Sequence, residues 1–149
     1  MGYVNVQLAE AARTETFNDN YWYWHHLWTY FTDNYTKAIV QCWKEEEKVI
    51  AELKALTNRV RPEGLVVEAT IPLNETTRAY FTDDAADGYR LKWFNIFLHD
   101  AQNREGIEIH NYGKELSFNH VTRGDAEALI EFFERHDTHV TFVPDETDD

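Results

Sequence analysis

The chain has 149 residues, of which 43% are hydrophobic and 15% aromatic, so it is long and apolar enough to form one domain around a single core. Its 27 acidic and 14 basic side chains give a net charge of -13, which argues against a protein that holds nucleic acid through the phosphates. Its one cysteine, Cys42, excludes an internal disulfide and a thiolate-rich metal site. Because it shows no leader-like N-terminus and no long apolar run, we expect a soluble cytoplasmic protein.

The first twenty residues are weakly patterned and allow either a short strand over residues 3–8 or a helix over residues 8–16. The next stretch, residues 21–60, has the clearest periodicity in the chain. Its apolar side chains recur at steps of three and four, as on one face of an α-helix: Trp24, Trp28, Phe31, Tyr35, Ala38, Cys42, Val49, Leu53, Leu56 and Val60. The spacing predicts a long N-terminal helix, either continuous or bent into two near Asp33, with Cys42 as a core residue.

The period changes after Pro62 and Gly64, which are expected to end this helix. Residues 65–71 alternate with a period of two, which predicts a strand. The short apolar piece at residues 79–81 predicts an edge strand. Residues 89–99 carry large apolar side chains at both odd and even positions, which predicts a central strand covered on both faces.

Residues 105–121 predict a β-hairpin. With Tyr112 and Gly113 as a two-residue turn, Ile109 lies opposite Leu116 and the next apolar pair along the strands also matches. A three-residue loop would instead place Ile109 opposite a glutamate, so the apolar pattern favours the first register.

Residues 125–136, after Thr122 or Gly124, predict an amphipathic helix whose end would carry His136, and residues 140–143 predict a last strand. The expected fold class is therefore α+β: a long N-terminal helix on an antiparallel sheet of four or five strands, with one C-terminal amphipathic helix. Residues 1–144 would form this single domain, and residues 145–149 a flexible acidic tail.

The sequence carries no recognisable catalytic or metal-binding pattern. Seven histidines are scattered without metal-ligand spacing, and we expect no metal and no cofactor. The acidic loop around Asp83 fails as a calcium loop because Ala85 and Phe94 occupy ligand positions. A catalytic group formed by His110, Glu115 and His120 stays an alternative, although a polar hairpin face is ordinary in a half-exposed sheet.

Two sets of residues are candidates for contact with a partner. Trp22 and Tyr23 do not fit on the buried face of the expected helix, and tyrosine and tryptophan often carry binding energy in protein interfaces. The second set is acidic and consists of Glu45, Glu46 and Glu47 on the exposed side of the same helix, together with the loop residues Asp83, Asp84 and Asp87.

These features favour a non-enzymatic acidic binding protein whose partner is a basic protein surface, such as that of a nucleic-acid-binding protein. In composition the chain is similar to virus-encoded inhibitors, anti-CRISPR or anti-restriction proteins among them, that mimic nucleic acid with carboxylates in the host cytoplasm. Two alternatives stay open. One is a small enzyme or ligand-binding domain with a histidine and carboxylate pocket, and the other is an assembly protein that forms a homodimer through the long helix.

Overall fold

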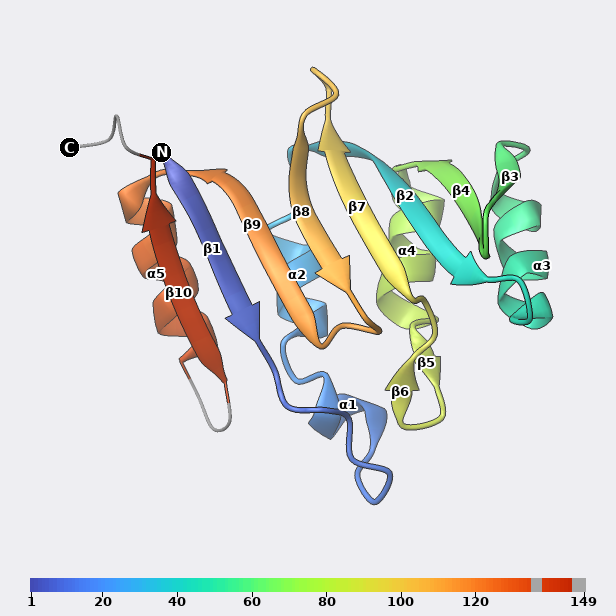
Figure 1. Cartoon of the computed structure of the whole chain (residues 1–149), viewed down its shortest axis with the longest axis horizontal. Coiled ribbons are helices and arrows are strands. Elements are labelled where there is room, and N and C mark those ends of the chain that lie inside the picture. Colours follow the sequence, from blue (N-terminus) through green and yellow to red (C-terminus); the bar gives the residue numbers. More distant parts are fainter. Residues whose placement is uncertain (135–137, 146–149) are drawn as a thin grey trace.

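One antiparallel sheet organises the molecule. The computed structural model describes residues 1–134 and 138–145, and in these residues the sheet has eight strands. In spatial order they are β10 (His139–Pro144), β1 (Gly2–Gln7), β9 (Glu115–Val121), β8 (Glu105–His110), β7 (Asn95–Asp100), β2 (Tyr35–Trp43), β4 (Val66–Pro72) and β3 (Val60–Glu63). Two short strands, β5 (Ala86–Asp87) and β6 (Arg90–Leu91), pair separately (Figure 1).

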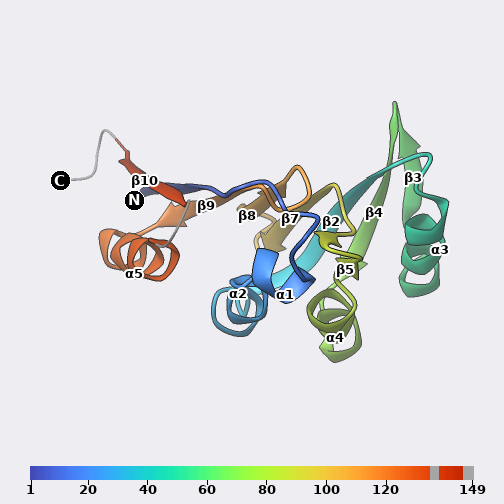
Figure 2. The same ribbon diagram turned by 90° about the horizontal axis from the view of Figure 1, so that it is seen from below.

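The helices all lie on one face of this sheet, and Figure 2 shows the other face uncovered. They are α1 (Phe17–Asn20), α2 (Trp24–Tyr30), α3 (Glu47–Leu56), α4 (Glu75–Asp83) and α5 (Arg123–Phe133). The buried core lies between the two layers, where alternate strand residues such as Val4, Val40 and Ile107 point toward the helices.

The prediction of a long helix over residues 21–60 is wrong. This stretch forms α2, then β2, then α3. In β2 the buried residues are Ala38, Val40 and Cys42, which alternate along the strand. Ala38 and Cys42 are four residues apart, a spacing that fits both a helix face and a strand face. The apolar spacing therefore did not distinguish a helix from a strand here. β2 pairs with β4 and β7 over most of its length, and this pairing stabilises the strand over a helix.

The sheet also has eight strands instead of the expected four or five. Of the added strands, β1 lies in a segment that was undecided, β2 lies within the expected helix, and β3 lies where that helix was expected to end. The long helix through which a homodimer was expected does not exist. The mixture of helices and strands is as predicted.

Two further predictions between residues 79 and 99 are wrong. The expected edge strand at residues 79–81 belongs to α4, which begins at an Asn74 capping box with Thr77. The expected single strand over residues 89–99 is divided into β6 and β7, and helices cover only one face of β7. Trp93 and Ile96 are both fully buried although they are three residues apart, which one regular strand covered on a single face does not allow.

The hairpin register is confirmed. Ile109 pairs with Leu116 in β8 and β9, and Ile107 pairs with Phe118. The turn has four residues instead of two, since the last strand pair is His110 with Glu115. The strand over residues 65–71, the C-terminal helix with Thr122 as its N-cap, and the last strand are also confirmed as β4, α5 and β10. His136 and most of the expected acidic tail lie outside the described residues.

Candidate functional site

An acidic groove lies between the start of α3 and β5 and has a volume of about 290 Å³. It brings together four of the predicted partner residues, Glu45, Glu46, Glu47 and Asp87, from segments about forty positions apart. The other lining residues are Lys48, Val49, Glu52, Ala86 and Lys92. Five carboxylates and two lysines line the groove, so its local charge is negative.

Glu46 holds the rim of this groove in place. Its carboxylate accepts a hydrogen bond from the backbone N–H of Trp43 at 2.9 Å, and another from the Tyr112 hydroxyl at 3.3 Å. Glu45 and Glu47 flank it and are exposed, with Glu47 in the first turn of α3, where the helix dipole favours a negative charge. One fixed carboxylate therefore sits between two that are free to meet a partner.

A buried ion pair forms the floor of the groove. Lys92, which is only 8% exposed, donates to Glu52 at 2.9 Å, and the Tyr80 hydroxyl donates to the same oxygen at 2.8 Å. Burial alone would raise the pKa of Glu52, but the hydrogen bonds from Lys92 and Tyr80 lower it below its ordinary value, so the carboxyl stays ionised. Lys92 neutralises Glu52, and the groove's excess negative charge lies at its rim.

Sequence reasoning missed both members of this floor. Glu52 lies within the expected long helix, where no pattern distinguished it, and Lys92 lies between apolar neighbours in an expected strand. A lysine inside an apolar run was the only signal, since a buried lysine requires a partner.

Asp83 and Asp84 lie beside β5 at the end of α4, the negative end of a helix dipole, where a carboxylate is disfavoured. Both are exposed, and within the described chain neither forms an ion pair. They are near Asp87 in the sequence but do not line the groove.

The structure places the two predicted aromatic residues elsewhere. Tyr23 is 1% exposed and belongs to the core, and its hydroxyl donates to the Gly113 carbonyl at 2.9 Å. Trp22 is half-buried against Phe132 and Phe133 of α5, with ring centroids 5.5 and 6.0 Å away. The carboxylate row and the aromatic residues are not neighbours, because the helix expected to carry both does not exist.

The histidines of the described residues do not converge. In the described ranges, no three histidine, cysteine or acidic side chains are placed to hold a metal ion. His110 faces Glu115 across the hairpin and lies 3.0 Å from Glu108, whereas His120 lines another cavity beside Asp100. The His110, Glu115 and His120 group is therefore not assembled at one place.

Comparison with known proteins gives no relative: no family model matches the chain, and no curated protein or solved structure matches it. Among the described residues, no helix has both the length and the apolarity to cross a membrane.

Proposed function

We propose that this chain is a non-enzymatic binding protein whose acidic groove and adjoining rim engage a basic surface on another protein, such as a surface that otherwise holds nucleic acid. The observation that carries the proposal is the gathering of Glu45, Glu47 and Asp87 around one groove.

Charge complementarity is the physical basis of this binding. Carboxylates at the rim of a groove attract a lysine- or arginine-rich surface and steer its approach, and such attraction is screened by salt. A partner that binds phosphates carries unpaired cations, which carboxylates satisfy in the same way. Association should therefore compete with nucleic acid for the same partner surface.

The experiment uses the immobilised protein and a cell lysate, with retained proteins released by salt raised from about 50 to about 200 mM. The test variant is Glu45→Gln/Glu47→Gln/Asp87→Asn, which removes three exposed charges and keeps Glu46 and its hydrogen bonds. The control, Glu127→Gln/Glu131→Gln/Glu134→Gln, removes three exposed charges near α5, at the opposite end of the sheet (Figure 1).

We expect wild type and control to retain the same basic proteins, the test variant to lose them, and duplex DNA to displace them. Retention that is indifferent to salt, or an equal loss in both triple variants, would reject this function. The second outcome would mean that net charge alone, and not the groove, is responsible.

A further inference from the structure

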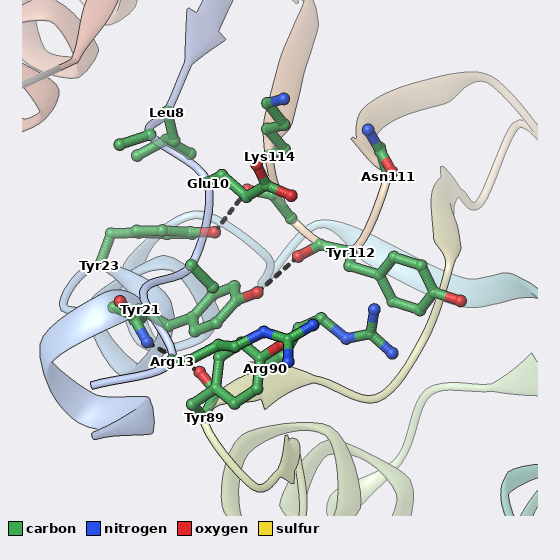
Figure 3. A pocket seen from close by; sticks show the side chains of 14 residues that line it. Leu8, Glu10, Arg13, Tyr21, Tyr23, Tyr89, Arg90, Asn111, Tyr112 and Lys114 are labelled. Atoms are coloured by element: carbon green, nitrogen blue, oxygen red, sulfur yellow. Dashed lines mark hydrogen bonds between the residues drawn. The ribbon is translucent and has the colours of Figure 1, made fainter. Parts of the chain in front are cut away.

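A second cavity has the opposite electrostatic character. It has a volume of about 530 Å³ and lies between the loop after β1, the end of α1, the residues before β6 and the β8–β9 turn (Figure 3). Three cations line it, namely Arg13, Arg90 and Lys114, and the only carboxylate among the lining residues is Glu10. In a chain of net charge -13, a local excess of two positive charges is unexpected.

These cations are available to a ligand. Over the described part of the chain, none of Arg13, Arg90 and Lys114 forms an ion pair with a carboxylate. Figure 3 shows Arg13 and Arg90 on one side of the cavity and Glu10 and Lys114 on the other. Cations that line a cavity without a carboxylate partner are suited to an anion.

Aromatic rings support the two arginines. The Arg90 guanidinium carbon lies 3.9 Å from the centroid of the Tyr112 ring, and that of Arg13 lies 6.0 Å from the Tyr89 ring. A guanidinium that rests on a ring keeps its N–H groups at its edge, where they match two oxygens of a phosphate. Arg90 is thus held before a ligand arrives, which lowers the entropy lost on binding, whereas Arg13 is exposed and has a longer ring contact.

The floor of the cavity consists of neutral tyrosines. The hydroxyls of Tyr21 and Tyr23 donate to the carbonyls of Tyr112 and Gly113, at 2.8 and 2.9 Å. Burial raises the pKa of Tyr21 and of Tyr23, so neither adds negative charge at neutral pH. The floor does not oppose an anion, and its rings offer apolar surface to the rest of a ligand.

Asn20 fixes the walls. Its side chain accepts a hydrogen bond from the Ala12 N–H at 2.9 Å and donates to the Ala12 and Tyr89 carbonyls at 3.0 and 2.9 Å. The Leu8 N–H donates to the Lys114 carbonyl at 2.8 Å. The loop after β1 is therefore tied to two other segments, and the cavity exists without a ligand.

We propose that this cavity binds a phosphate-bearing organic molecule of about nucleotide size, with the phosphate held by Arg13 and Arg90. The two excess positive charges match a phosphate dianion, and the volume lies in the range of small-molecule sites and well above the size of the anion alone. This role goes beyond the acidic groove and does not depend on it.

Titration calorimetry of the whole chain tests the proposal with three probes: adenosine 5′-monophosphate, ribose 5-phosphate and adenosine. We expect one or both phosphates to bind and adenosine to bind at least tenfold more weakly. The variant Arg13→Gln/Arg90→Gln should weaken phosphate binding at least tenfold. The control Arg59→Gln/Arg123→Gln removes the same charge from exposed sites outside the cavity and should bind as wild type does.

An Arg90→Lys variant keeps the positive charge and loses the planar guanidinium group. It serves as a second test in case the double variant does not fold, and it should bind the phosphates with intermediate affinity. Failure of both phosphates to bind, binding of adenosine as tight as that of its phosphate, or unchanged binding in the Arg13→Gln/Arg90→Gln variant would overturn the proposal.

Discussion

At the scale of single residues, Lys92 shows how one buried cation shapes the acidic groove. It lies in the core beside Trp93, with its ammonium 2.9 Å from Glu52 and 5.4 Å from the centroid of the Tyr80 ring. Without it, Glu52 would keep the hydrogen bond from Tyr80 but lose its counter-ion, which is costly for a half-buried carboxylate.

We predict that Lys92→Met lowers the free energy of unfolding by about 1–2 kcal/mol, less than for a fully buried pair because water reaches Glu52. Urea denaturation at neutral pH measures it. The matched control is Lys48→Met, at an exposed lysine of the same groove for which the described residues show no ion pair; its effect should stay within about 0.5 kcal/mol. Equal effects of the two changes would contradict a stabilising role for the Lys92–Glu52 pair.

At the scale of elements, the β8–β9 turn fixes one wall of the cavity around Arg13 and Arg90 through an uncommon backbone. Asn111, Tyr112 and Gly113 all have positive φ, at 53°, 57° and 82°. Asparagine and glycine adopt this region readily, whereas tyrosine does so at a cost of about 1–2 kcal/mol. The geometry places the Tyr112 ring against Arg90, and the surrounding contacts must offset the strain.

Gly113→Ala should be among the most damaging changes at a glycine of positive φ. A Cβ there would lie 2.9 Å from Tyr21 Cε1 and 2.9 Å from the Tyr23 hydroxyl, both on buried rings that cannot move aside. The control is Gly64→Ala, where φ is 65° and no atom lies within 4 Å. We predict that Gly113→Ala destabilises by about 1–3 kcal/mol more than Gly64→Ala in thermal or urea unfolding. An equal loss would show that only backbone strain matters.

The elements also differ in how far their sequence predicted them. The hairpin was predictable because apolar residues alternate in two adjacent segments and only one register pairs them. The segment around Ala38 and Cys42 was not, since a four-residue spacing suits a helix and a strand alike. Cys42 was nevertheless predicted correctly as a core residue, because both interpretations bury it.

At the scale of the whole molecule, the helices cover one sheet face, and polar side chains satisfy one another on the other. Asn95 donates to Gln41 at 3.0 Å, and Gln41 donates to Glu68 at 3.2 Å, across three neighbouring strands. Such a network is compatible with solvent, so the open face needs no covering layer. The fully buried apolar side chains lie beneath the sheet, together with Tyr23 and Cys42, whereas Ile39 and Phe97 pair on the open face and are half-buried.

These buried weak acids predict loss of stability at alkaline pH. Burial raises the pKa of Cys42 to about 12 and that of Tyr112 to about 12, and raises the pKa of Tyr23 and Tyr80 as well. Between the ordinary and the raised pKa, the unfolded chain loses a proton that the folded chain keeps, so unfolding is favoured as pH rises. The stabilising contribution is complete below about pH 9 and is lost toward about pH 12.

We expect the melting temperature, followed by circular dichroism, to fall steadily above about pH 9, because each such group lowers the free energy of unfolding by up to about 1.4 kcal/mol per pH unit. Tyr23→Phe removes one group and should make this slope shallower, even if it lowers the melting temperature at neutral pH. Tyr30→Phe, at an exposed tyrosine, is the control and should leave the slope unchanged. A melting temperature that stays flat to about pH 11 would contradict the prediction.

By itself the sequence determined the mixed α and β content, the register of the hairpin, the C-terminal helix and strand, and the acidic residues that are candidates for partner contact. These follow from local periodicity and charge, which neighbours in the chain carry. Only the tertiary structure decided that residues 35–43 are a strand, that Asp87 joins Glu45 and Glu47 at one groove, and that Arg13, Arg90 and Lys114 meet at one cavity. Strand pairing and cavities depend on contacts between distant segments, and the spacing of residues within one segment does not encode them.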